Sequence, residues 1–112
     1  MPLCHVVTFS FKAETSTEWI DVFGAALDEL GAQTPTISYR HGRDAKLRPG
    51  NADYCVTAIF EDEAAFTAYV TSREHVRIVS ELLAPQLQSR SAVQFSIDAT
   101  TLPSEVQASR LV

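Results

Sequence analysis

Two side chains that can move protons, the phenol of Tyr69 and the imidazole of His75, lie six residues apart in the chain. A neutral imidazole can take a proton from an acidic carbon or from water, and a phenol can polarise a carbonyl group. On an unbroken helix this spacing would direct the two side chains to different sides, but the Thr71-Ser72 pair interrupts the helical pattern between them. The break allows both to converge on one cavity, so we predict Tyr69 and His75 as a catalytic acid–base pair.

Each of the two residues also has a purely structural interpretation. Tyr69 can be a core aromatic residue whose hydroxyl reaches the surface, and His75 can be a partly exposed helix residue. Ser72 is a predicted N-cap, so His75 falls at the third helical position, where the positive end of the helix dipole favours an uncharged imidazole. The sequence leaves the structural and the catalytic interpretation open.

A further histidine, His5, lies in the first predicted strand. Residues 3–11 alternate with period two, which places His5 on a strongly apolar face. A histidine there is commonly a core residue bonded to a neighbour, but with Tyr54 facing the same way it can form the polar floor of a pocket. Apolar side chains from the surrounding elements would form the walls. The predicted substrate-binding residues are His5, Val7, Phe23, Leu27, Tyr54, Phe66 and Val79.

The first half of the chain contains the signals of one strand, one helix and one hairpin. After the first strand, a capping-box pattern at residues 15–18 predicts a helix that ends at Gly31. Residues 36–42 and 53–60 read as two strands joined by a long polar connection. These elements supply the expected floor of the pocket and part of its wall.

The second half adds two short helices and a last strand. Asp62 and Ser72 can cap the two helices, Pro85 ends the second, and residues 91–98 alternate like a strand. The order β-α-β-β-(α-α)-β predicts a four-stranded antiparallel sheet with helices on one face, which is a ferredoxin-like α+β fold. The apolar stripe of the second helix is expected to be Val76, Val79, Leu82 and Leu83.

The opposite face of this sheet is half apolar and needs a cover. Pairing with a second copy is the expected solution, so we predict a two-fold homodimer. The residues expected on that face are Val6, Thr8, Ser10, Cys55, Thr57 and Ile59.

Length and composition restrict the class of protein. The 112 residues fit one domain, expected at 1–99 with a tail at 100–112, and a net charge of −5 argues against nucleic-acid binding. With no long apolar run and no basic leader we expect a cytoplasmic protein without membrane contact, in which Cys4 and Cys55 are reduced. The basic stretch 40–48 can be a solvated loop or an anion-binding site.

Several kinds of site are not expected. The three histidines have no His-x-x-x-His spacing, the two cysteines have no Cys-x-x-Cys spacing, and no glycine-rich turn is suited to phosphate. We therefore predict no metal and no cofactor.

Four segments together resemble the stress-responsive A/B barrel (Dabb) family. They are residues 5–12, Gly42-Arg43-Asp44, residues 54–61 and residues 69–75, and the resemblance covers about residues 3–98. It implies a dimeric α+β barrel. It also implies that Tyr69 and His75 match the catalytic pair of a cofactor-free polyketide cyclase in this family, and that His5 matches its pocket histidine.

The chain departs from the family pattern at the pocket. Ser72-Arg73 stands where the family often has His-Pro, and Tyr54 and Leu27 stand where that cyclase has a pocket histidine and a pocket tyrosine. The resemblance implies a small-molecule-binding protein, with cyclase-like, lyase or isomerase chemistry on a carbonyl compound as the expected activity. The alternatives are a non-catalytic stress-response or assembly protein and a cofactor-free monooxygenase.

Overall fold

The central strand β1 (Leu3–Phe11) alternates between buried and half-buried side chains along its whole length. The computed structural model, which describes residues 1–98, 100 and 102, thus confirms the period-two pattern of this segment. The odd-numbered residues, His5 among them, face the core. This face of β1 is the base on which the rest of the fold is built.

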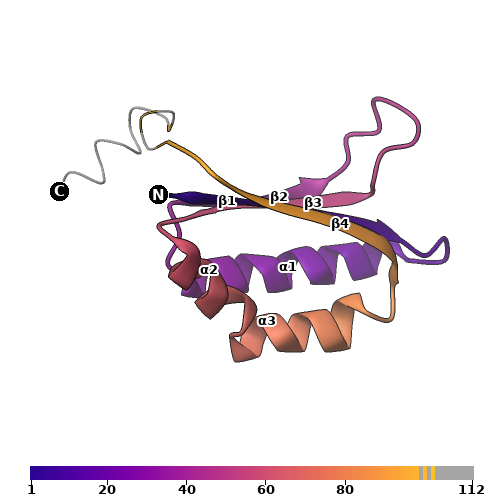
Figure 1. Cartoon of the computed structure of the whole chain (residues 1–112). Coiled ribbons are helices and arrows are strands. Elements are labelled where there is room, and N and C mark those ends of the chain that lie inside the picture. The colour runs from indigo at the N-terminus through magenta and orange to yellow at the C-terminus, as the bar shows by residue number, and fades with distance from the viewer. Residues whose placement is uncertain (99, 101, 103–112) are drawn as a thin grey trace.

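Three strands complete the sheet: β2 (Ser38–Arg43), β3 (Tyr54–Phe60) and β4 (Leu87–Ser96). The strand order is β2-β3-β1-β4 and every pair is antiparallel. All helices lie on one face of this sheet (Figure 1). The fold is therefore the predicted ferredoxin-like α+β arrangement.

The N-cap of helix α1 (Thr17–Gln33) lies one residue after Thr15, where the predicted capping box begins, and the helix ends beyond its predicted stop at Gly31. Ser16 is the N-cap, and its hydroxyl accepts a hydrogen bond of 3.1 Å from the backbone N–H of Trp19. The expected end at Gly31 is wrong, because this glycine serves packing: a Cβ atom there would lie 2.5 Å from Cδ1 of Tyr39. Gly31 thus lets β2 approach the helix closely.

Two short helices follow β3 and are capped as predicted. Asp62 caps α2 (Glu63–Val70) by accepting from the N–H of Ala65 at 2.8 Å, and Ser72 caps α3 (Arg73–Arg77). The chain thus breaks between Tyr69 and His75, as the Thr71-Ser72 pair predicted.

The helical segment after α3 differs from the expected regular helix. Residues Ile78–Leu83 form a π-helix, η1, in which the N–H of Ala84 bonds to the carbonyl of Val79 at 2.9 Å. The wider turns shift the apolar stripe within η1, where Ile78 and Leu83 are buried while Val79 is 40% exposed. Val76 lies before η1, in α3, and is 52% exposed. The predicted stripe is therefore wrong at Val76 and incomplete without Ile78.

Strand β4 starts four residues before the predicted beginning at Ser91. The extra residues pair with the end of β1, where the register shifts between Ser10 and Phe11.

The predicted C-terminal tail, 100–112, lies outside the described residues except for Thr100 and Leu102. No helix in the described part of the chain is long and apolar enough to span a bilayer.

The face of the sheet opposite the helices is covered by no described element (Figure 1). Val93 and Phe95 of β4 are 54% and 48% exposed, and β4 pairs them with Val6 and Cys4 of β1. The apolar residues of this outer face therefore continue from β1 onto the edge strand.

Replacement of Gly31 tests whether the α1–β2 approach needs a glycine. Alanine favours a helix by about 1 kcal/mol over glycine, yet Gly31→Ala should destabilise the protein by about 1–3 kcal/mol because Tyr39 must move. Urea unfolding measures the change. Gly42→Ala, where a Cβ meets nothing within 4 Å, is the control and should stay near wild type. Equal stability of Gly31→Ala and Gly42→Ala would contradict the packing role.

Candidate functional site

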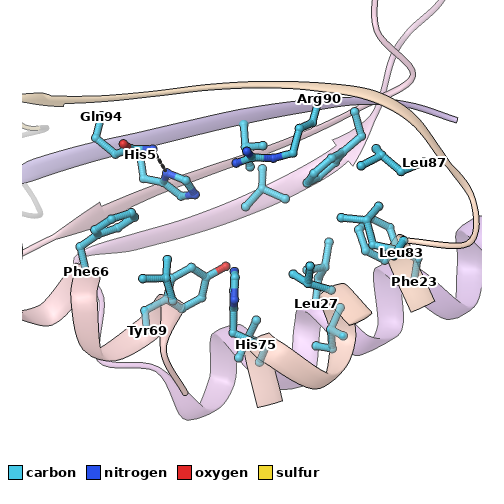
Figure 2. A pocket seen from close by; sticks show the side chains of 18 residues that line it. His5, Phe23, Leu27, Phe66, Tyr69, His75, Leu83, Leu87, Arg90 and Gln94 are labelled. Atoms are coloured by element: carbon cyan, nitrogen blue, oxygen red, sulfur yellow. Dashed lines mark hydrogen bonds between the residues drawn. The ribbon is translucent and has the colours of Figure 1, made fainter. Parts of the chain in front are cut away.

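A cavity of about 450 Å³ lies between the sheet and the helices, below strand β4 (Figure 2). Its wall is largely apolar, and its size falls in the range of small-molecule sites. Four polar side chains on the sheet and on the α2–α3 segment face it together with one tyrosine. The lining residues are His5, Val7, Phe9, Phe23, Leu27, Leu30, Val56, Phe66, Tyr69, Val70, His75, Ile78, Val79, Leu83, Ala84, Leu87, Arg90 and Gln94.

Tyr69 and His75 lie against each other in this wall. Their ring centroids are 4.8 Å apart at an interplanar angle of 64°, and Figure 2 shows the Tyr69 hydroxyl beside the His75 ring. Their positions depend on the chain break. The hydroxyl of Ser72 donates to the carbonyl of Tyr69 at 2.8 Å and accepts from the backbone N–H of His75 at 3.2 Å. One side chain therefore links the backbones of both residues.

The imidazole of His75 is held as a neutral base. Burial lowers its pKa below the ordinary value of 6.5, a hydrogen bond to the backbone of Val70 raises it in part, and the charge of Arg90 lowers it further. The carbonyl of Val70 can only accept, so one ring nitrogen of His75 donates to it. The other nitrogen of the neutral ring then carries the lone pair that can take a proton.

Tyr69 is buried, and its hydroxyl lies 3.1 Å from the hydroxyl of Tyr39. Burial raises the pKa of Tyr69 while the hydrogen bond from Tyr39 lowers it, and burial raises the pKa of Tyr39 strongly. Both hydroxyls therefore keep their protons, and either can donate in this contact. When Tyr39 donates, the proton of Tyr69 is free to bond an oxygen atom in the cavity.

His5 occupies the sheet side of the cavity. The side-chain nitrogen of Gln94 lies 2.9 Å from Nδ1 of His5, and an amide nitrogen only donates, so Nδ1 accepts and the neutral ring carries its proton on Nε2. The pKa of His5 is lowered by burial first and then by the charges of His75 and Arg90. His5 is therefore a neutral donor opposite the Tyr69–His75 pair.

Tyr54 is the one predicted site residue that does not line the cavity. Its hydroxyl is 2.6 Å from Nδ1 of His41, whose Nε2 is 2.6 Å from a carboxylate oxygen of Asp28. Gly24 leaves room for this hydroxyl, since a Cβ there would lie 3.2 Å from it. Tyr54 therefore belongs to a chain of hydrogen bonds that joins α1, β2 and β3. The other predicted residues, His5, Val7, Phe23, Leu27, Phe66, Tyr69, His75 and Val79, all line the cavity.

Two polar lining residues, Arg90 and Gln94, are absent from the site predicted from the sequence. Arg90 lies before the predicted start of the last strand, and Gln94 lies within that strand. The signal that would have found them is the alternation of β4, because Gln94 pairs with His5 and Arg90 with Phe9, both on the helix-covered face of β1. The polar edge of the cavity thus comes from an exposed strand.

The described residues offer no metal centre. Within 1–98, 100 and 102, no three His, Cys, Asp or Glu side chains are grouped so that they could hold an ion. The polar groups around the cavity are donors and one neutral base, which suit an oxygen-bearing organic molecule.

Comparison with protein families gives one match, which covers nearly the whole chain. The sequence model of the Stress responsive A/B Barrel Domain (Dabb) matches residues 3–97. No curated protein matches the sequence.

Solved structures share the fold. A dimeric ferredoxin-like protein of unknown function from Thermobifida fusca is 31% identical with a TM-score of 0.80, covering 87% of this chain and 92% of that one. The hydroxynitrile lyase of Passiflora edulis is 20% identical with a TM-score of 0.75, covering 91% and 97%. A Dabb family protein of Mesorhizobium loti is 19% identical with a TM-score of 0.73, covering 87% and 97%.

The role of Ser72 as the link between Tyr69 and His75 can be tested by removing its hydroxyl. Ser72→Ala should lower stability by about 1 kcal/mol, the usual cost of a lost N-cap, and should shift the ring signals of both residues in NMR spectra. Ser16→Ala removes the cap of α1 and is the matched control. It should cost a similar amount of stability without changing the Tyr69 and His75 signals. Unchanged signals in Ser72→Ala would refute the link.

Proposed function

This chain belongs to the stress-responsive A/B barrel family, and we propose that it is a cofactor-free enzyme that moves a proton on a carbonyl compound. The observation that carries the proposal is the contact between Tyr69 and His75 in the wall of an apolar cavity. A neutral base and a hydroxyl donor at one point of such a cavity are the two groups that this chemistry requires.

The proposed step begins with the unprotonated nitrogen of His75. It takes a proton from the carbon next to the carbonyl group. The electron pair of the broken C–H bond forms a carbon–carbon double bond, and the π pair of the carbonyl group moves to its oxygen. The resulting enolate oxygen accepts a hydrogen bond from Tyr69, and in this step Tyr39 donates to the oxygen of Tyr69. The apolar wall strengthens this bond by excluding water.

Cyclisation, isomerisation and lyase reactions of carbonyl compounds can all use such a proton transfer. A lyase with this fold exists in Passiflora edulis, and at 20% identity the likeness supports the fold alone. The alternative is a binding protein with the same cavity and no turnover. The enzyme and the binding protein differ in one respect, because only the enzyme requires the unprotonated ring nitrogen of His75.

We further propose that the chain forms a homodimer through its outer face, as expected from the sequence. Proteins of the same fold from Thermobifida fusca, Bacteroides fragilis and Jannaschia are described as dimeric. The exposed Val93 and Phe95 extend the apolar surface that a second copy would cover. The helices and the cavity lie on the opposite side of the sheet, so each subunit would keep its own site.

Proton transfer can be tested without knowledge of the natural substrate. Phenylacetone in deuterated buffer exchanges the protons next to its carbonyl group, and NMR follows the exchange. The wild-type protein should accelerate it, and His75→Gln should lower the rate about 10²–10⁴-fold, as for a positioned base. Tyr69→Phe should lower it less, because the ring remains. A wild-type rate no higher than that of His75→Gln would contradict the enzyme.

The pH dependence of this exchange follows from the environment of His75. Because burial lowers the pKa of its imidazole, the base stays unprotonated at pH values where an exposed histidine is charged. The rate should therefore fall on the acid side with a midpoint below 6.5. A midpoint above that value would mean that the imidazole is not the buried base described here.

The dimer can be tested at the outer face. Val6→Glu places a charge in the predicted interface and should give monomers or aggregates in light scattering at micromolar protein concentration. Val22→Glu is the control, since Val22 is 55% exposed on α1, away from the outer face. A monomeric wild type would refute the dimer.

A further inference from the structure

Arg90 brings a full positive charge to the cavity, the only one among the lining residues that the structure describes. It lies on β4 opposite Phe9, on the same face of the sheet as Gln94, and it lines the cavity although the strand is exposed. Figure 2 shows its side chain extending from β4 over the cavity in the direction of His5. The guanidinium is therefore placed at the rim, above the apolar wall.

No acidic residue in the described part of the chain balances this charge. Among residues 1–98, 100 and 102, no Asp or Glu lines the cavity, and Arg90 makes no ion pair or hydrogen bond with any of them. By contrast, Arg43 pairs with Asp21, and Arg77 pairs with Glu74 at 3.1 Å. The chain has 14 acidic residues and 9 Lys and Arg, so an excess of basic residues does not explain why this guanidinium lacks a described partner.

The neighbouring polar groups add donors and no negative charge. His5 carries its proton on Nε2, and Figure 2 shows the ring nitrogen that does not bond Gln94 directed into the cavity. The positive charge of Arg90 also contributes, after burial, to the lowered pKa of both His5 and His75. Among the described lining residues, the charge of Arg90 thus has no negative counterpart.

We propose that the cavity binds an amphipathic organic anion. Its carboxylate oxygens would lie on Arg90 and on the Nε2 hydrogen of His5, and its apolar body among Phe23, Leu27 and Leu83. A guanidinium is the side chain best suited to a planar pair of oxygens. The apolar surface and the 450 Å³ volume suit an aryl or alkyl body of small-molecule size. This ligand class deepens the proposed function by naming its substrate class, and it does not require that His75 be a base.

The test compares para-butylbenzoate with para-butylbenzamide, which have the same shape and differ in charge. Isothermal titration at a pH above the imidazole pKa should show that the wild type binds the benzoate about tenfold or more tighter than the benzamide, as expected for hydrogen bonds to a charged group. Arg90→Gln should remove this preference and leave benzamide binding unchanged. Arg90→Lys should retain part of it, since the charge remains without the planar pair of donors.

Two controls separate the ligand class from general charge and from catalysis. Arg40→Gln removes an exposed charge of β2 that does not line the cavity, and it should bind both probes like wild type. His75→Gln should keep the benzoate preference even where it abolishes proton exchange. If exchange fails in the wild type while the preference holds, the enzyme proposal falls and the ligand class stands.

Three results would overturn the ligand class. They are equal affinity of the wild type for the two probes, no binding of either probe at millimolar concentration, and an unchanged benzoate preference in Arg90→Gln. Thermal unfolding of each variant accompanies the titrations. If Arg90→Gln does not fold, the comparison of Arg90→Lys with wild type decides, because an anion site must lose affinity for the benzoate alone.

Discussion

The hydroxyl of Ser72 is the contact on which the arrangement of the cavity depends. It donates to the carbonyl of Tyr69 and accepts from the N–H of His75, so it ends one helix and begins the next with a single atom. Without this break the two side chains would project from different sides of one helix. With the break, residues six positions apart become neighbours, and their rings meet over the apolar face of β1.

Antiparallel pairing then supplies the opposite side of the cavity. Because β1 lies between β3 and β4, its inward face sets which residues of both neighbours point to the helices. His5 and Gln94 are paired by this register and hydrogen-bonded to each other. The cavity therefore combines the imidazole base His75 and the cation Arg90 with three further polar side chains, and burial is the main cause that lowers the pKa of both imidazoles beside Arg90.

The fold and half of the site follow from short-range patterns. Period-two alternation and the caps Asp62 and Ser72 are local signals, and they predicted the sheet, the chain break and the Tyr69–His75 pair. Contacts between distant segments could not be predicted in this way. The sequence predicts a helix stop at Gly31 because it does not show the packing of Tyr39 against this glycine. It predicts Tyr54 as a pocket residue because it does not show the hydrogen bond between Tyr54 and His41. The sequence does not predict Arg90 as a site residue because the predicted last strand begins at Ser91, whereas β4 begins at Leu87.

The π-helix Ile78–Leu83 has a consequence for the history of this sequence. Its backbone bond from residue 84 to residue 79 spans one residue more than an α-helical bond. Removal of one residue here would restore an α-helix and turn the segment by about 100° relative to α3. The positions of Val79 and Leu83, which line the cavity, would then be taken by their neighbours in the chain, such as Ser80 and Ala84. Homologues with a one-residue deletion at this point should therefore have diverged in the shape of the cavity while keeping the same strands and caps.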